Sequence, residues 1–292
     1  FGVSAKYIDA LRKFKPKLKY KYKLSKLRTI CSTGSPLSND GFRYVYENIK
    51  QNVHLASIAG GTDLVGCLIL GNLFSNVYKG EIQGQSLGID VDVFTEEGKS
   101  INDSEKGELV VKNPFPSMPI KFWGDDDGQK YHKAYFTRFK NIWHHGDFIE
   151  KTPNNGFIMR GRSDATLNPG GVRIGTAEIY QQVENIDFIT EALVVGQHYN
   201  DDVRIILFVT TEKNHQLDSD KIKIIKSKIR KNCSPKHVPS IVLKVPEIPR
   251  TKSGKIVELA VRKIINGEEV DNKEAISNPS CLDYFKNLKD LK

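Results

Sequence analysis

Long apolar runs, closely spaced cysteines and an initiating methionine are all missing from this sequence of 292 residues. A membrane-spanning helix needs roughly 18 consecutive apolar residues, whereas the best candidate, residues 64–73, is shorter and contains two glycines and an asparagine. We therefore predict no membrane span. The chain begins at Phe1 without a charged and then apolar leader, and we expect it to be part of a longer protein. The four cysteines stand far apart, unlike those of a zinc site or a disulfide-rich domain, and favour a reducing cytosol: Cys31, Cys67, Cys233 and Cys281.

Acidic residues are scarce in two segments, although the composition as a whole is that of a globular protein. Hydrophobic residues make up 39% and charged residues 27% of the chain, and its length suits two domains better than one. Residues 6–28 contain ten lysines and arginines against one acid, Asp9, and residues 221–236 contain seven basic residues and no acid. Such segments indicate a phosphate-rich partner, either a nucleic acid or a phosphorylated cofactor, although a solvated lysine-rich surface is the simpler alternative. Because no RNP, KH or zinc-finger pattern is present, we expect no nucleic acid partner.

The periodicity of apolar residues divides the chain into two parts of different character. The first part combines a helix at residues 39–50 with short strands at residues 53–58, 89–94, 108–111 and 156–159. Beyond Gly161 the pattern predicts a compact α+β domain of about 100 residues. Its helices are expected at residues 176–186, 218–233 and 258–265, and its strands at residues 192–195, 203–210 and 241–245. The predicted fold class is therefore α/β followed by α+β, with domains at residues 1–162 and 163–292 and a boundary near residues 162–164.

Four turns pair glycine with a charged or hydroxyl residue, a combination that is common in phosphate-binding sites. They lie at residues 32–36, 60–63, 145–147 and 251–255. Glycine lets the backbone approach a ligand closely, and the polar neighbour supplies charge or holds a metal. Taken singly, each turn more often serves only to reverse the chain.

Other kinds of site are disfavoured by the same residues. Ile256 follows Lys255 where a Walker phosphate loop requires serine or threonine, and no Gly-x-Ser-x-Gly elbow supports serine hydrolysis. The adjacent His144 and His145 would point to opposite faces of a strand, so they are poorly placed to bind one metal ion.

The segment GRSDATLNPGGVRI at residues 161–174, followed by Glu178 and Ile179, resembles the hinge motif of the superfamily of acyl-CoA synthetases, peptide-synthetase adenylation domains and luciferases. The other turns resemble further motifs of that superfamily in the expected order. These are an adenine-contacting loop at residues 34–36, a threonine–acid motif at 61–63, a structural motif at 107–109, a ribose-binding aspartate at 146–147 and a loop with the catalytic lysine at 249–255. Five motifs in one order over most of the chain make the resemblance specific.

Within the superfamily, four segments are similar to the acetoacetyl-CoA synthetase family. They are SIAGGTD at residues 57–63, NPFPSMP at 113–119, NPGGVR at 168–173, and the tail with IING at 264–267 and NP at 278–279. Asp63 stands where most members of the superfamily have glutamate, and His145 where many have threonine. The Ser/Thr/Gly-rich loop that grips phosphate in the superfamily is expected before Phe1 and is absent from this sequence.

The resemblance implies the fold, the reaction and its cofactors. The fold would be the C-terminal part of the large adenylate-forming domain, followed by the small mobile C-terminal domain. A carboxylate and ATP would form an acyl-adenylate and diphosphate, and the thiol of coenzyme A would then displace AMP. ATP, Mg²⁺ and coenzyme A are the expected cofactors, and acetoacetate is the expected acid.

The resemblance also assigns roles to individual residues. Lys255 would be catalytic, bridging the substrate carboxylate and the α-phosphate. Asp164 would be the hinge, although a simple cap is the alternative role for an aspartate in that position. Glycine at position 60 would leave room in the acyl pocket, and we expect Gly60→Trp to favour acetate. The remaining assignments are ATP or AMP binding by Gly34, Ser35, Pro36, Thr62, Asp63 (also Mg²⁺, through the phosphates), Asp147, Arg162 and Arg173, and coenzyme A binding by Gly170, Gly171 and Arg230.

Two alternatives remain open on the sequence alone. The first is an acyl-CoA synthetase for another short acid, such as acetate, propionate or butyrate. The second is a non-catalytic chain that binds nucleotide, coenzyme A or RNA through its basic faces. We further expect the 292-residue chain by itself to have little or no synthetase activity. The sequence gives no indication of the oligomeric state.

Overall fold

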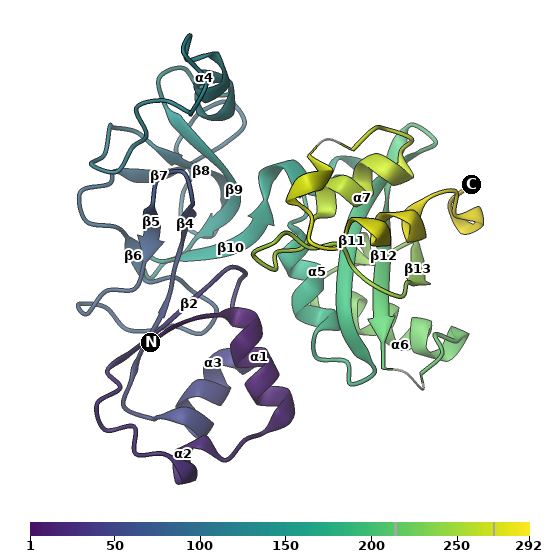
Figure 1. Cartoon of the computed structure of the whole chain (residues 1–292), viewed down its shortest axis with the longest axis horizontal. Coiled ribbons are helices and arrows are strands. Elements are labelled where there is room, and N and C mark those ends of the chain that lie inside the picture. The colour runs from purple at the N-terminus through teal and green to yellow at the C-terminus, as the bar shows by residue number, and fades with distance from the viewer. Residues whose placement is uncertain (213–214, 271) are drawn as a thin grey trace. The chain divides into compact units, whose positions relative to one another are not determined.

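The computed structural model describes residues 1–212, 215–270 and 272–292 and divides the chain into two compact units (Figure 1). The N-terminal unit is Phe1–Arg160 and the C-terminal unit is Gly161–Lys292. The division falls just before the boundary at residues 162–164 that the sequence predicts. Gly161 has a φ of +126°, and a Cβ atom at this position would lie 2.8 Å from Oγ1 of Thr176. Glycine is therefore required at the start of the C-terminal unit.

The N-terminal unit begins with a three-stranded parallel sheet of β1 (Gly2–Ser4), β2 (Thr29–Thr33) and β3 (His54–Ser57). Helix α1 (Ala5–Phe14) and the short helix α2 (Leu18–Lys21) come between β1 and β2. Helix α3 (Asn39–Tyr44) continues as a π-helical turn at Val45–Ile49, where the sequence predicts one helix at residues 39–50. The helices and the sheet share one apolar core, which includes Ile8, Ile30, Phe42, Val45 and Leu55.

The rest of the N-terminal unit is antiparallel. One sheet pairs β4 (Ala59–Gly61), β5 (Gly66–Leu70) and β6 (Gly84–Gln85). A second sheet has the order β10-β9-β8-β7, with β7 at Val91–Phe94, β8 at Lys106–Val111, β9 at Trp143–Lys151 and β10 at Phe157–Arg162. Helix α4 (Gln129–Tyr135) precedes β9. The two sheets contribute to a common core that includes Leu68, Leu109, Trp143 and Ile149.

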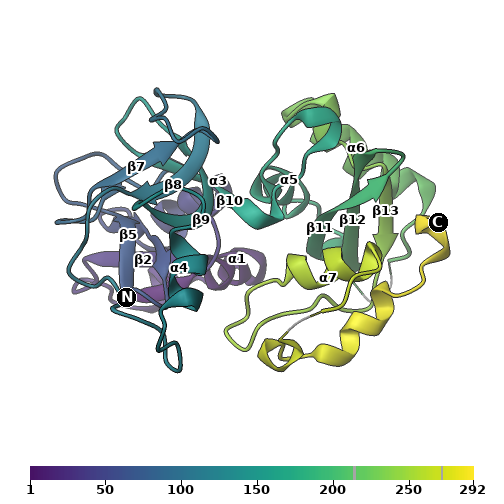
Figure 2. The ribbon, with the colours of Figure 1, turned by 90° about the horizontal axis from the view of Figure 1, so that it is seen from above.

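The C-terminal unit is a three-layer α+β domain (Figure 2). Strands β11 (Ile189–Tyr199) and β12 (Asp202–Thr211) are antiparallel, and β13 (Ile241–Lys244) runs parallel to β12. Helices α5 (Thr176–Val183) and α6 (Ser219–Asn232) cover one face of this sheet, and α7 (Glu258–Ile265) lies on the other. Because neighbouring strand residues point to opposite faces, Leu207 packs towards α5 and α6, while Ile206 and Phe208 pack towards α7.

The predicted fold class is confirmed, and several bounds need correction. Helix α5 ends at Val183 instead of residue 186, and β11 and β12 extend beyond residues 192–195 and 203–210 at both ends. Helices α1 and α4 and strand β9 have no counterpart among the expected elements. Over the described residues, no helix is long and apolar enough to cross a bilayer.

Candidate functional site

In the N-terminal unit, the turns at residues 34–36 and 60–63 lie at the same edge of the parallel sheet. The first follows β2 directly, with Gly34 at a φ of +85°. The second comes after β3, and its two glycines belong to strand β4, so only Thr62 and Asp63 lie in a turn. The two connections are held together where the Ile58 amide donates to the carbonyl of Ser32 at 2.9 Å. The carboxyl ends of parallel strands are where open α/β sheets bind ligands. Ser35 is exposed at this edge, and Pro36 is half-buried.

Residues 145–147, predicted as a turn, lie inside strand β9 and approach this edge next to Gly61. A Cβ atom on Gly61 would lie 3.0 Å from Cε1 of His145, so the absence of a side chain permits the close approach. Nε2 of His145 is 3.6 Å from Oδ2 of Asp147, and both side chains are buried. Nε1 of Trp143 donates to Nδ1 of His145 at 3.3 Å. The structure thus brings together three motifs that lie far apart in the sequence.

A bulge in β9 produces this arrangement. Glu108 pairs with Phe148 and Val110 with His144, so β9 accommodates extra residues between these two pairs. Gly146, inside the bulge, has a φ of +79°, a conformation that favours glycine. His145 and Asp147 flank this glycine.

The two adjacent histidines of β9 have different partners. Nε2 of His144 lies 2.9 Å from Oε2 of the buried Glu108, whose other carboxylate oxygen is 3.3 Å from Arg138. His145 faces Trp143 and Asp147 instead, as described above. Among the residues that the structure describes, no three His, Cys, Asp or Glu side chains are grouped so that they could hold a metal ion.

Asp63 is connected to the same aromatic cluster by Tyr135, at the end of α4. The Tyr135 hydroxyl donates to Oδ2 of Asp63. The ring of Tyr135 stacks on Trp143 with centroids 3.6 Å apart and an interplanar angle of 13°. The sequence predicts neither Tyr135 nor Trp143 at the site. Tyr135 lies 72 residues from Asp63 in the sequence, so their contact could not be inferred from a local motif. Thr62 and Asp63 are both exposed.

Gly60 has a structural reason to be glycine besides the predicted acyl pocket. It lies in β4, and a Cβ atom there would overlap the carbonyl oxygen of Gly66 in β5 and lie 2.6 Å from Cα of Cys67. The expected change of specificity in Gly60→Trp therefore cannot be separated from a change of structure, because the larger side chain cannot be accommodated without separating β4 from β5.

We expect Gly60→Ala to lower the free energy of unfolding of the N-terminal unit by about 1–3 kcal/mol, the usual cost of overpacking a close backbone contact. Gly84→Ala is the matched control, because its nearest neighbour would be Nδ2 of Asn72 at 3.4 Å. Urea unfolding, followed by the fluorescence of the buried Trp143, measures both variants. Equal stability of Gly60→Ala and the parent protein would contradict this account of Gly60.

In the C-terminal unit, the predicted hinge is a 3₁₀ turn at Ser163–Ala165. Oγ1 of Thr166 donates to the carbonyl of Ser163 at 2.7 Å, and Nη1 of Arg262 donates to the carbonyl of Asp164. Nε of Arg162 is 3.8 Å from Oδ1 of Asp164, and both side chains are about half exposed. Helix α7 therefore holds the main chain of the turn, while the charged side chains of Arg162 and Asp164 reach solvent.

The two glycines of the predicted coenzyme A face lie in a turn at Pro169–Gly171, with φ values of +56° and +77°. The Gly170 amide donates to both carboxylate oxygens of Asp202, at 2.8 and 3.1 Å. This bond and one from the Val203 amide lower the pKa of Asp202. A Cβ atom on Gly170 would overlap Nζ of Lys236.

Asp202 and Lys236 were not among the predicted site residues. Lys236 belongs to the basic segment at residues 221–236. The sequence therefore indicates its charge, but it does not indicate that Lys236 lies next to Gly170. Asp202 follows a two-residue turn, Asn200 and Asp201, with φ values of +49° and +60°. That turn sequence is a hairpin signal, but it gives no indication of contact with Gly170. Arg230 is exposed in the last turn of α6, and Arg173 is half-buried.

Lys255 projects from a turn whose backbone is tied at its base. The Thr251 amide donates to the carbonyl of Lys255 at 2.8 Å, and the Lys255 amide donates to Oγ1 of Thr251 at 3.1 Å. Nη1 of Arg250 donates to the carbonyl of Gly254 at 2.7 Å. The Lys255 side chain is exposed and forms no ion pair within the described part of the chain.

Helix α7 begins three residues after Lys255, and its first residue, Glu258, is half-buried next to α5. The hydroxyl of Tyr180 donates to Oε1 of Glu258 at 3.1 Å and accepts from the Val194 amide at 3.1 Å. Burial raises the pKa of Glu258 above its usual value, and the charge of Asp164 contributes in the same direction. This partly buried contact fixes the start of α7, which links the lysine turn to the hinge turn within one unit.

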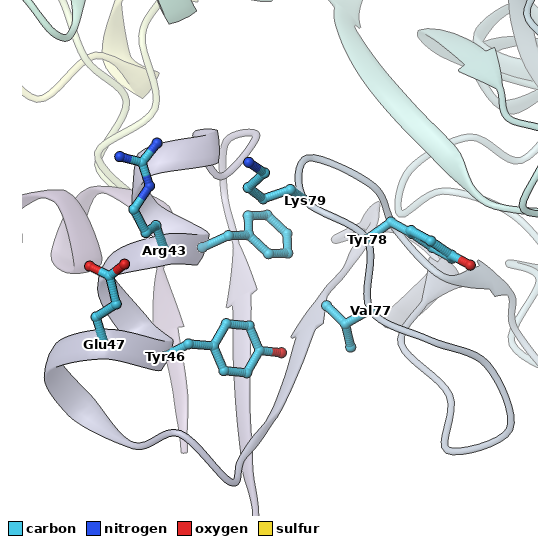
Figure 3. Close-up of a pocket in the computed structure, with 7 residues that line it drawn as sticks. Arg43, Tyr46, Glu47, Val77, Tyr78 and Lys79 are labelled. Atoms are coloured by element: carbon cyan, nitrogen blue, oxygen red, sulfur yellow. The ribbon is translucent and has the colours of Figure 1, made fainter.

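A separate pocket of about 410 Å³ lies in the N-terminal unit between the α3 region and residues 77–79 (Figure 3). Arg43, Tyr46 and Glu47 line one side, and Val77 faces Tyr46 from the other. Its volume is within the range of small-molecule sites. None of the predicted site residues lines it, so it is not part of the candidate site.

Comparisons with known proteins show what the sequence and the fold of this chain are similar to. Residues 178–255 match the family model of the AMP-binding enzyme C-terminal domain. The chain shares the fold of an anthranilate CoA ligase at a TM-score of 0.74 and 18% identity, covering 90% of this chain and 49% of that one. Residues 178–255 thus match the C-terminal domain of AMP-binding enzymes, and the chain has the fold of the C-terminal part of an adenylate-forming enzyme.

Within the superfamily, the similarity is to acetoacetyl-CoA synthetases, and it extends over the whole chain. Identity is 57% to the acetoacetyl-coenzyme A synthetase of Rhizobium meliloti (100% of this chain, 45% of the relative) and 44% to that of Gallus gallus (99% and 44%). The structure of the Streptomyces lividans enzyme matches with a TM-score of 0.91 at 39% identity, covering 98% of this chain and 44% of that one. The resemblance to this family is confirmed, and the chain spans about 45% of the length of the curated relatives.

Proposed function

We propose that this chain is the C-terminal part of an ATP-dependent acid–CoA ligase that activates acetoacetate. The observation that carries the proposal is the 57% identity to an acetoacetyl-coenzyme A synthetase along the entire chain. In the first half-reaction, a carboxylate oxygen of acetoacetate attacks the α-phosphorus of ATP and diphosphate leaves. In the second, the coenzyme A thiol attacks the acyl carbon, loses its proton, and displaces AMP.

The N-terminal unit would bind AMP at the edge of its parallel sheet. The turn at residues 34–36 would contact adenine, and Asp147 would accept hydrogen bonds from the ribose hydroxyls. Thr62 would donate to a phosphate oxygen beside it. The proximity of Gly61 to His145, with Asp147 two residues further along β9, supports one continuous nucleotide site.

Asp63 suits Mg²⁺ bound through the phosphates of ATP. Its exposed carboxylate is a hard oxygen ligand, and the Tyr135 hydroxyl bonds Oδ2. The described chain offers no cage of several protein ligands. This agrees with the preference of Mg²⁺ for one or two carboxylates together with phosphate oxygens and water. The ion would neutralise charge on the leaving diphosphate.

The C-terminal unit would supply the cation for the first step and the coenzyme A face for the second. Exposed Lys255 is free to reach a carboxylate and an α-phosphate, and Arg162 and Arg173 carry the guanidinium forks suited to phosphate. The turn with Gly170 and Gly171 would face the pantetheine thiol, and Arg230 would bind the 3′-phosphate. Rotation of the C-terminal unit about the turn at Asp164 would first present Lys255 to the nucleotide and then the turn with Gly170 and Gly171.

We expect full-length protein to prefer acetoacetate by about tenfold or more in kcat/KM over acetate, propionate and butyrate. Acetoacetate has a keto oxygen that butyrate lacks, and a pocket that bonds this oxygen leaves a polar group unpaired with butyrate. The rate of adenylation of each acid is measured as acid-dependent exchange of labelled diphosphate into ATP. The Lys255→Ala variant is the blank.

Equal or better exchange with another short acid would assign the protein to that acid. Binding of RNA that is weakened by salt, without any binding of ATP or coenzyme A, would support a non-catalytic chain. Cytosolic localisation is part of the proposal, and fractionation of cells expressing the full-length protein tests it.

A further inference from the structure

Six lysines alternate with apolar residues at residues 13–23, in the sequence KFKPKLKYKYK. No acidic residue occurs between Asp9 and Asp40. The alternation does not form a strand. Residues 13 and 14 end α1, and residues 18–21 form α2. The proposed ligase site uses none of these residues.

The fold separates the lysines of the segment from the leucines in it and beside it. Lys15, at a φ of +46°, ends α1, and its amide donates to the carbonyl of Leu11 at 2.8 Å. Leu11, Leu18 and Leu24 pack against the core of the N-terminal unit. The six lysines are all exposed: Lys13, Lys15, Lys17, Lys19, Lys21 and Lys23.

Aromatic side chains are exposed among these lysines. Phe14 is 85% exposed, Tyr20 84% and Tyr22 52%. Such side chains are usually among the main contributors to cores and interfaces. Nζ of Lys21 lies 5.4 Å from the ring centroid of Tyr22, so cation and ring are neighbours on this surface. We call residues 13–23 the lysine–aromatic surface.

The positive charge of the lysine–aromatic surface is only weakly offset by the protein. Burial raises the pKa of Asp9, and the charge of Lys13 opposes this rise without forming an ion pair. None of its six lysines takes part in an ion pair over residues 1–212, 215–270 and 272–292. The nearest acids along the chain, Asp9 and Asp40, both approach Arg12, at 3.6 and 4.0 Å. The surface therefore complements an anionic partner.

We propose that the lysine–aromatic surface binds the anionic face of a lipid bilayer. Each lysine near such a face contributes about 1 kcal/mol, and aromatic side chains are favoured at the boundary between headgroups and acyl chains. Lysine stems bury their methylenes while the ammonium stays at the headgroups. The contact is peripheral and reversible, and it is independent of ligase activity.

A second basic segment, helix α6, shows what separates a surface suited to a bilayer from one that is only positively charged. Helix α6 carries a similar density of lysine and arginine, but it contains no aromatic residue. A polynucleotide partner is less well suited to residues 13–23, since single-stranded RNA requires a groove that tracks its backbone beside the stacking rings. The pocket of the N-terminal unit has none of these residues in its lining.

The test is co-sedimentation of full-length protein with vesicles of phosphatidylcholine alone or with about one-third phosphatidylserine. We expect binding to the anionic vesicles only, with a loss at high salt. Lys19→Gln with Lys21→Gln should weaken binding about tenfold or more. Phe14→Ser with Tyr20→Ser should weaken it at every salt concentration at which the parent protein binds.

The matched control is Lys223→Gln with Lys231→Gln in α6, which removes the same charge. This pair should leave vesicle binding within about twofold of the parent, and thermal unfolding should show that all variants remain folded. Equal binding to neutral vesicles, no binding to anionic vesicles, or equal losses from both lysine pairs would overturn the proposal. So would tighter binding to single-stranded RNA than to vesicles through the same residues, which would make the partner a nucleic acid.

Discussion

Replacing Lys255 with alanine is expected to lower the rate of acyl-adenylate formation by roughly 10²- to 10³-fold in the full-length protein. Negative charge increases at the α-phosphorus as the carboxylate attacks and diphosphate leaves. An ammonium held beside that centre stabilises the transition state more than the ground state, so its loss affects kcat more than KM. The backbone of residues 251–255 favours this role, because two hydrogen bonds between Thr251 and Lys255 hold the turn while the Lys255 side chain remains exposed.

The measurement is diphosphate exchange with acetoacetate, together with direct detection of the acyl-adenylate. Lys252→Ala is the control, because Lys252 is exposed in the same turn and its substitution removes the same charge. We expect this control to stay within about threefold of the parent, as is usual for an exposed side chain outside the chemistry. Unchanged adenylate formation in Lys255→Ala would exclude the proposed role and, with it, the assignment of this turn.

Sequence periodicity predicted the elements of the C-terminal unit better than those of the N-terminal unit. Helix α7 has the predicted bounds, and α6 is within one residue of them at each end, because both follow an uninterrupted helical repeat. Strand β9 is not predicted by the sequence, because three successive residues next to a bulge at Gly146 are all buried: Asp147, Phe148 and Ile149. An alternating pattern cannot be read through such a break.

For the candidate site, the sequence predicts the positions of the turns, but it does not predict which distant residues contact them. Short motifs with glycine at fixed spacing located the turns, because their conformational requirements are local. The partners of those turns could not be predicted, since Tyr135 is 72 residues from Asp63, Asp202 is 32 from Gly170 and Arg262 is 98 from Asp164. Gly60 shows the reverse case, in which a glycine that resembles a pocket residue is also required by strand pairing.

Asp164→Pro is expected to separate the two half-reactions of the full-length protein. Proline fixes its own φ and narrows the conformations open to Ser163. The turn at Ser163–Ala165 then loses two of the torsions that a rotation of the C-terminal unit needs. In the proposed mechanism, adenylation uses one setting of the hinge, whereas a complete turnover uses two. We therefore expect adenylate formation to stay within about threefold, while formation of the coenzyme A ester falls by roughly 10²-fold, the cost of misplaced reacting groups.

Single-turnover experiments distinguish these steps, because adenylate can be accumulated before coenzyme A is added. Asp164→Ala is the matched control. It removes the carboxylate near Arg162 but leaves the backbone free to rotate, so both steps should survive. A loss in Asp164→Ala equal to that in Asp164→Pro would assign the effect to the lost carboxylate and not to the hinge. Equal losses of both half-reactions in Asp164→Pro would mean that the turn supports the fold of the C-terminal unit, in which Arg262 of α7 already holds the Asp164 carbonyl.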